Sequence, residues 1–134
     1  MPGSFYDTNV LVYLASADKQ KADRAEELIA EGGTISVQVL NEIAQVARRR
    51  MGFGWAELRT FLTTIRAVLT VVPLTVETHE TGLALAERYR LSLYDAMIAA
   101  AALASGCSTL WSEDMQHGLV IARKLRIVNP FRES

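Results

Sequence analysis

The feature that most constrains the fold is an alternation of short apolar segments with helical segments along the chain. The apolar segments are too uniformly apolar for strands of a sheet with one solvated face. Strands that alternate with helices in this way form a parallel sheet covered on both sides. The sequence therefore predicts an α/β fold of three layers with four or five short central strands, at 3–7, 34–36, 70–74, 108–111 and 126–129.

Helical segments fill the intervals between these strands, and several begin at a capping residue. Ser36, Thr75 and Ser92 each precede a helical stretch, and each hydroxyl can accept a hydrogen bond from the first turn. Gly32-Gly33 ends an earlier stretch. Helices are expected at about 9–15, 19–31, 37–50, 55–69, 76–90 and 93–105.

Composition limits the classes of function. A chain of 134 residues without repeats or linkers predicts a single domain. A formal net charge of −1 argues against a protein that coats nucleic acid by charge alone. If four carboxylates bound metal cations, however, the net charge of the remaining side chains would be positive. The longest apolar run, Ala96–Ala104, is too short to cross a membrane. We expect no secretion signal, and the single cysteine, Cys107, suits the cytoplasm.

Four carboxylates stand at positions that need an explanation. Asp7 ends the first expected strand, and Asp114 follows the strand at 108–111 by three residues. In open parallel sheets, binding sites form outside the carboxyl ends of the strands. Asp95 interrupts the otherwise apolar stretch Leu93–Ala104, and Glu42 falls at the edge of the apolar face of its helix.

Each acid also has a purely structural explanation. Asp7 can cap a helix that begins at Thr8, and Glu42 can be a solvated boundary residue. Asp95 stands three residues after Ser92, which is the spacing of a capping box. Both explanations stay open for each residue taken alone. Four neighbouring anions would repel one another, however, and a hard divalent cation is the usual resolution. Oxygen-only ligands favour Mg²⁺ or Mn²⁺, and neither Cys107 nor the histidines have zinc spacing.

Five segments, in order along the chain, carry a resemblance to a known family. They are "FYDTNVLVYL", "NE" at 41–42, "LSLYDAMIAAAA", "LWSEDMQHG" and "RIVNPF". Together they resemble the PIN domain and, more narrowly, the VapC toxins of prokaryotic toxin–antitoxin pairs. The resemblance covers nearly the whole chain. It implies a single PIN domain over residues 1–134, a three-layer α/β/α fold with a central parallel sheet, and Mg²⁺- or Mn²⁺-dependent ribonuclease activity.

The same resemblance assigns roles to individual residues. The acidic quartet of the family maps onto the four carboxylates above, as catalytic residues and metal ligands: Asp7, Glu42, Asp95 and Asp114. Thr8, Asn9 and Ser112 map onto supporting positions. Many members carry a further Asp after the last acid, but Met115, Gln116 and His117 fill that stretch here. Secondary candidates for a second metal or for substrate contact are Glu113, His117 and Arg49.

The resulting hypothesis is an endoribonuclease that cleaves RNA by attack of a metal-activated water. The resemblance also implies a homodimer and a cognate antitoxin. Arg48, Arg49 and Arg50 end the Glu42 helix, where they either stabilise its C-terminus or contact RNA phosphates or an acidic partner. A non-catalytic PIN-like binding module is the main alternative. A Mg²⁺-binding receiver and a haloacid dehalogenase-type phosphatase are weaker, because each needs a second acid near Asp7.

Overall fold

A sheet of six strands forms the centre of the molecule. The computed structural model describes residues 3–132, and the strands lie in the order β3-β2-β1-β4-β6-β5. All pair in parallel except β5, which runs antiparallel to β6 at one edge. The strands are β1 (Gly3–Tyr6), β2 (Thr34–Ser36), β3 (Thr70–Val72), β4 (Cys107–Trp111), β5 (Val120–Ile121) and β6 (Leu125–Val128).

The sequence predicted four or five strands, and the structure has a sixth, the edge strand β5. This strand has only two residues and joins β6 through Ala122 and Arg123, whose φ angles are 53° and 59°. Two residues are too few to show an alternation of apolar and polar side chains, and Ala and Arg are not usual turn residues at positive φ. The other five strands were predicted, and their ends agree within two residues.

The six helical segments predicted from the sequence are all present. Ser36, Thr75 and Ser92 cap their helices as expected, accepting from the backbone N–H groups of Val39, Thr78 and Asp95. The first helix ends in a 3₁₀ turn, η1. The elements are α1 (Thr8–Val12), η1 (Tyr13–Ala15), α2 (Lys19–Ile29), α3 (Val37–Arg49), α4 (Trp55–Val68), α5 (Val76–Tyr89) and α6 (Leu93–Ala104).

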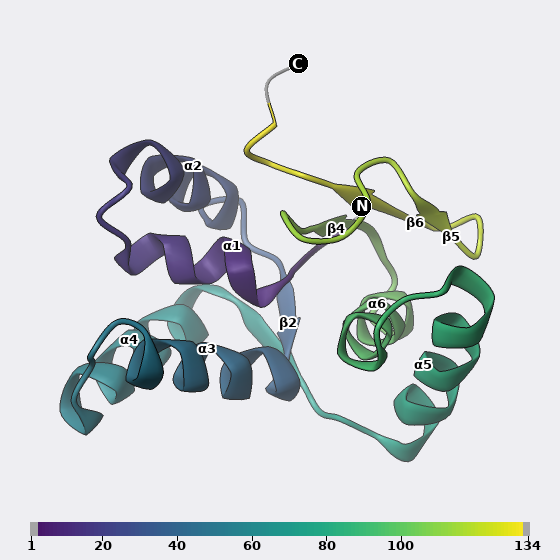
Figure 1. Ribbon diagram of the computed structural model, residues 1–134, viewed down its shortest axis with the longest axis horizontal. Coiled ribbons are helices and arrows are strands. Elements are labelled where there is room, and N and C mark those ends of the chain that lie inside the picture. The colour runs from purple at the N-terminus through teal and green to yellow at the C-terminus, as the bar shows by residue number, and fades with distance from the viewer. Residues whose placement is uncertain (1–2, 133–134) are drawn as a thin grey trace.

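Helices cover both faces of the sheet and make the three predicted layers. Helix α6 packs against β2, β4 and β6, and its small side chains from Ala96 to Ala102 are buried. On the other face the Tyr6 hydroxyl donates to the carbonyl of Gly32 at 2.7 Å, beside the end of α2. Helices α5 and α6 lie at one end of the molecule, and α1 to α4 at the other (Figure 1). No helix within residues 3–132 has the length and apolar character needed to cross a membrane.

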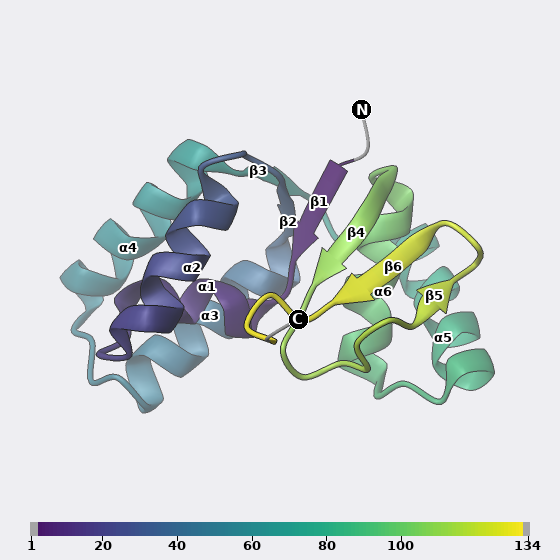
Figure 2. The same cartoon turned by 90° about the horizontal axis from the view of Figure 1, so that it is seen from above.

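The order of the strands creates a crevice beside β1. The chain moves from β1 to β2 and β3 on one side, and later to β4 and β6 on the other. The arrowheads of β1, β4 and β6 point toward the same region, where α1 begins (Figure 2). Tyr6 is in register with Trp111, so the residues that follow, Asp7 and Ser112, leave the sheet side by side. A ligand site is expected at such a reversal of strand order.

Candidate active site

Asp7 both caps α1 and points into the crevice. Its carboxylate accepts hydrogen bonds from the backbone N–H of Thr8 at 2.7 Å, from the Ser112 hydroxyl at 2.7 Å and from the Asn9 amide at 3.0 Å. The residue is only 4% exposed. Burial raises the pKa of Asp7 to about 6, although the bonds from Ser112 and Thr8 act in the opposite direction. The capping explanation and the functional explanation are thus compatible for this residue.

Asn9 connects Asp7 to the loop that follows β4. Its side-chain amide donates to Asp7 and also to a carboxylate oxygen of Asp114, at 3.2 Å. Its carbonyl oxygen accepts from the backbone N–H of Glu113 at 3.0 Å. The Ser112 hydroxyl, which donates to Asp7, accepts in turn from the backbone N–H of Met115. These bonds fix the position of the loop that carries Asp114 relative to the end of β1.

Glu42 enters the same crevice from α3. One carboxylate oxygen accepts from the Thr8 hydroxyl at 2.7 Å, and the other from the Gln38 amide at 2.8 Å. Gln38 also donates to the backbone carbonyl of Tyr94 at 3.1 Å, which ties α3 to the first turn of α6. Gln38 was not among the residues predicted to support the site. Its position one helical turn before Glu42 is the signal that could have identified it.

Asp95 lies in the first turn of α6. Its backbone N–H donates to the Ser92 hydroxyl at 3.2 Å, which is one half of a capping box. The reciprocal bond, from the Ser92 backbone to the Asp95 carboxylate, is not formed among the described residues. Burial raises the pKa of Asp95, and the charges of Asp114 and Glu42 raise it further, while the Ser92 hydroxyl lowers it. The hydroxyl of its own cap and the neighbouring acids therefore act on the pKa of this carboxylate in opposite directions.

The four carboxylates line one pocket of about 320 Å³. They come from the end of β1, from α3, from α6 and from the loop after β4, so the fold brings together residues far apart in the sequence. Arg50 is the only Lys or Arg among its lining residues. We call this hollow the acidic pocket; its lining comprises Asp7, Thr8, Asn9, Val12, Glu42, Gln45, Val46, Arg50, Asp95 and Asp114.

The acidic pocket has the donor chemistry of a Mg²⁺ or Mn²⁺ site without a finished coordination geometry. Its acids supply only oxygen, which hard divalent cations prefer. Within residues 3–132, however, no three acidic, histidine or cysteine side chains are arranged to hold an ion as they stand. The buried carboxylate of Asp7, with Asp95 and Glu42 as charged neighbours, is a group that a nearby cation would stabilise. The donor set therefore fits such a cation in its chemistry, although the side chains as described are not yet arranged around one.

Comparison with known protein families assigns the chain. The family model described as the PIN domain matches residues 4–119, a range that contains all four carboxylates. The chain belongs to the PIN domain family. No curated protein sequence matches it.

Solved structures with the same fold include toxins and toxin–antitoxin complexes. A toxin–antitoxin complex from Klebsiella pneumoniae has a TM-score of 0.75 and 20% sequence identity, covering 97% of this chain and 99% of that one. VapC20 from Mycobacterium tuberculosis, a sarcin-ricin loop cleaving toxin, has a TM-score of 0.68 and 23% identity, covering 83% and 91%. VapBC2 from Rickettsia felis, bound to a promoter DNA fragment, has a TM-score of 0.62 and 20% identity, covering 83% and 87%. At these identities the likeness establishes the fold.

The secondary candidates lie outside the acidic pocket of this PIN domain. The Glu113 carboxylate accepts from the Tyr13 hydroxyl at 2.6 Å and pairs with Lys21. His117 Nδ1 accepts from the backbone N–H of Asn129 at 3.0 Å. Arg49 lines a neighbouring hollow. None of the three lines the acidic pocket, so the structure gives no support for a second metal held by Glu113 or His117.

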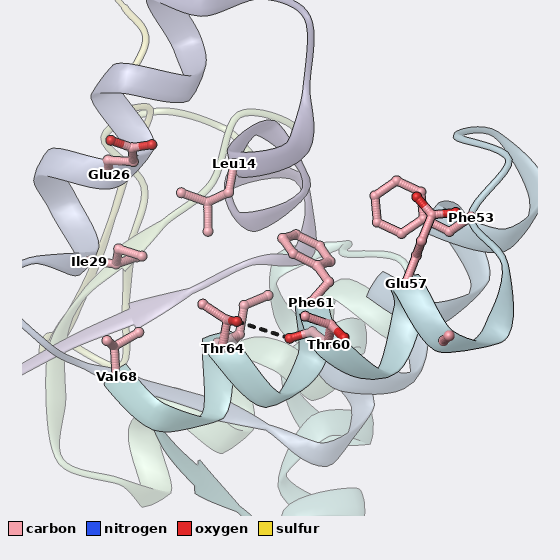
Figure 3. Close-up of a pocket in the computed structure, with 11 residues that line it drawn as sticks. Leu14, Glu26, Ile29, Phe53, Glu57, Thr60, Phe61, Thr64 and Val68 are labelled. Carbon is pink, nitrogen blue, oxygen red and sulfur yellow. Dashed lines mark hydrogen bonds between the residues drawn. The ribbon is translucent and has the colours of Figure 1, made fainter.

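A larger and very different hollow is lined by η1, α2 and α4. The apolar groove, of about 710 Å³, runs between α4 on one wall and η1 and α2 on the other (Figure 3). Phe53 and Phe61 meet edge to face at its end, with ring centroids 5.8 Å apart. Its walls come from distant parts of the chain, so no local pattern predicts it. The lining residues include Leu14, Glu26, Ile29, Phe53, Glu57, Thr60, Phe61, Thr64, Ile65 and Val68.

Proposed function

We propose that this PIN domain is a metal-dependent endoribonuclease, the toxin of a type II toxin–antitoxin pair. The observation that carries the proposal is the convergence of four carboxylates from four separate elements on one pocket. Structural packing alone does not require this gathering, because buried and neighbouring anions destabilise a fold unless a cation joins them. The likeness of the fold to PIN toxins supports the same function.

Asp7, Asp95 and Asp114 are the proposed ligands of Mg²⁺ or Mn²⁺, and Glu42 either ligates or orients the attacking water. When bound, the ion would lower the pKa of a water molecule and stabilise charge on the phosphate. Glu42 is suited to orienting a water because the Thr8 hydroxyl and the Gln38 amide hold its two oxygens. Asn9 and Ser112 hold Asp7 in place. Supporting contacts of this kind commonly affect activity by about 10–100-fold.

A cleavage assay on defined RNA tests the proposal. The purified chain should cut RNA with Mg²⁺ or Mn²⁺ present and stop in excess chelator. Asp7→Asn should abolish cleavage. Asp23→Asn is the matched control, since Asp23 is exposed on α2 and does not line the acidic pocket. Full activity in Asp7→Asn, or activity in chelator, would refute the assignment.

One observation favours a second candidate, a non-catalytic PIN-like module that binds RNA or protein. Within the described residues the acids do not already stand in a metal-holding arrangement. Such a module would bind RNA without cutting it at any concentration of Mg²⁺ or Mn²⁺. The same assay therefore separates the two candidates.

We further propose a cognate antitoxin that covers the toxin, and a homodimer of the toxin itself. The apolar groove offers a surface for the antitoxin, because its walls are mostly apolar and open to solvent. Thr64→Arg, at the wall of the groove, should weaken binding of an inhibitory antitoxin by about tenfold or more. Thr81 on α5 is exposed but outside the groove, so Thr81→Arg should bind the antitoxin normally.

The proposed homodimer has its own test. Light scattering on the purified chain measures the mass in solution and shows whether two copies associate.

A further inference from the structure

A basic and aromatic hollow adjoins the acidic pocket along α3. It measures about 380 Å³, and its lining includes Gln45, Arg48, Arg49 and Trp55. Gln45 lines this hollow and the acidic pocket alike, so the two lie next to each other. Arg48 stands six residues after Glu42, which places it about 9 Å further along the helix. We call this hollow the Arg–Trp hollow.

A flat stacking surface is already assembled in the Arg–Trp hollow. The Arg48 guanidinium lies over the Trp55 ring, with its central carbon 4.1 Å from the ring centroid. An Arg48 nitrogen also donates to the backbone carbonyl of Phe53 at 2.8 Å, which holds the guanidinium plane in place. Trp55 nevertheless remains 61% exposed. Aromatic rings and guanidinium planes presented in this way are the surfaces on which unpaired RNA bases stack.

The charges around this surface are free to bind an anion. Arg48, Arg49 and Arg50 are exposed, and within residues 3–132 none of them forms an ion pair. Their position at the end of α3 is favourable for the helix dipole, but that effect requires neither Trp55 nor a hollow. A phosphodiester chain that enters the acidic pocket meets four carboxylates, so cations are needed beside it to hold the neighbouring phosphates.

We propose that the Arg–Trp hollow binds the nucleotide next to the scissile phosphate of single-stranded RNA. The base stacks on the Trp55–Arg48 surface, and Arg49 contacts the adjoining phosphate. This inference rests on the proposed function, because that function places the scissile phosphate in the acidic pocket. It narrows the substrate to unpaired RNA, since a base inside a duplex is not free to stack on a protein side chain.

Equilibrium binding of a fluorescent single-stranded RNA, measured in chelator so that no cleavage occurs, tests this site. Trp55→Ala should raise Kd by about tenfold or more, and Trp55→Phe by much less, because it keeps an aromatic face. Arg49→Gln should reduce the slope of log Kd against log salt by about 0.7. Arg88→Ala is the matched control, because the Arg88 guanidinium carbon likewise lies near an aromatic ring, 5.3 Å from the centroid of Tyr89. Arg88 belongs to α5, at the opposite end of the molecule from α3 (Figure 1), so its loss should leave Kd unchanged.

A strand of the same length without bases separates stacking from charge. Trp55→Ala should bind it as the wild type does, whereas Arg49→Gln should bind it more weakly. In the cleavage assay Trp55→Ala should raise KM and leave kcat within about twofold. Far-ultraviolet circular dichroism and Tm show whether Trp55→Ala is folded. If it is not folded, the Arg49→Gln variant tests the site instead, because Arg49 is exposed and forms no ion pair among the described residues.

The outcomes separate this site from the nuclease proposal. A wild type that cleaves RNA, with unchanged Kd and KM in Trp55→Ala and Arg49→Gln, overturns the Arg–Trp hollow alone. A wild type that binds single-stranded RNA through Trp55 but never cleaves overturns the nuclease proposal and supports the hollow as an RNA-binding site. A chain that binds no RNA, or that uses these residues only for an acidic peptide, overturns the inference.

Discussion

The acidic pocket and the apolar groove are two hollows of one molecule with opposite physical character. The pocket, of about 320 Å³, contains four carboxylates, and those of Asp7, Glu42 and Asp114 accept hydrogen bonds from side chains of neighbouring elements. The groove is more than twice as large, at about 710 Å³, and is mostly apolar (Figure 3). If volume were the criterion, the groove would be identified as the active site. The acidic pocket is the better candidate, because residues with raised pKa values are concentrated at functional sites.

The two hollows also differ in their effect on stability. Burial and neighbouring charge raise the pKa values of Asp7 and Asp95, which means that their ionised forms are disfavoured in the folded chain. Apolar contacts in the groove, such as that between Phe53 and Phe61, stabilise the fold. Removing a charge from the pocket should therefore affect activity, whereas removing a ring from the groove should affect stability. Four predictions test this contrast.

Among these four, the largest effect is expected from Asp95→Asn. Losing one group that stabilises charge at a reacting centre typically reduces the rate by about 10²–10³-fold. Stability should be unchanged or higher, because a disfavoured charge has been removed. Single-turnover cleavage and Tm check both expectations. Glu77→Gln is the control, since Glu77 likewise stands in the first turn of its helix, α5. Loss of activity accompanied by unfolding would contradict the contrast.

The second prediction concerns pH. Because the pKa of Asp7 is raised from 3.8 to about 6, the folded state binds this proton more tightly than the unfolded state. Without metal, its contribution to stability is complete below about pH 4 and is lost as the pH rises through about 6. One pKa unit corresponds to about 1.4 kcal/mol, so the loss reaches about 3 kcal/mol.

Urea unfolding of the wild type and Asp7→Asn between pH 4 and 8 measures this difference. The free energy of unfolding of the wild type should fall relative to the mutant as the pH rises. Mg²⁺ should restore it at pH 7.5 and have little effect at pH 4.5, where Asp7 is protonated. A difference between the two proteins that is independent of pH would show that Asp7 ionises normally.

The third prediction concerns Asn9→Ala, which removes the amide between Asp7 and Asp114. Cleavage should fall by about 10–100-fold, the usual effect of losing a group that orients a ligand. The metal concentration needed for half-maximal activity should also rise. Gln20→Ala, an exposed change on α2, should have neither effect. Activity of Asn9→Ala equal to that of the wild type would mean that the carboxylates are positioned without this contact.

The smallest effect is expected from Phe61→Ala in the groove. Losing the edge-to-face contact with Phe53 and part of a half-buried ring should lower the free energy of unfolding by about 1–2 kcal/mol. Cleavage should stay within about twofold of the wild type. Urea unfolding and the cleavage assay check the pair of expectations, with exposed Thr63→Ala on the same helix as the control. A loss of cleavage well beyond twofold, with little change in the free energy of unfolding, would contradict the distinction between the two hollows.

Local patterns predicted most of the fold. Capping residues such as Ser36, Thr75 and Ser92 fixed the starts of helices because a hydroxyl there satisfies a backbone N–H within three residues. The edge strand β5 was not predicted, because its formation depends on pairing with β6 rather than on its own two residues. Its turn places Ala122 and Arg123 at positive φ without the usual Gly or Asn.

The predicted acids reach one pocket, but their surroundings could not be read from spacing. Glu113 is adjacent to Asp114 in sequence, yet its carboxylate turns away to Tyr13 and Lys21. Among the three arginines that end α3, Arg50 lines the pocket, whereas Arg48 and Arg49 line the hollow beside it. Each further residue rotates a side chain by about 100° around the helix axis. The packing of α3 against α1 and α4 then decides which of these side chains reach the acidic pocket and which reach the neighbouring hollow.

By itself the sequence determined the helices, five of the strands and the candidate acids, because capping, periodicity and the position of charge relative to strand ends act over a few residues. Tertiary structure alone decided which carboxylates share a pocket, which basic groups adjoin it and where an apolar groove opens. These features join residues more than a hundred positions apart, as Asn9 and Asp114 illustrate with a hydrogen bond of 3.2 Å. Such contacts depend on the order and register of the strands, which no short segment contains.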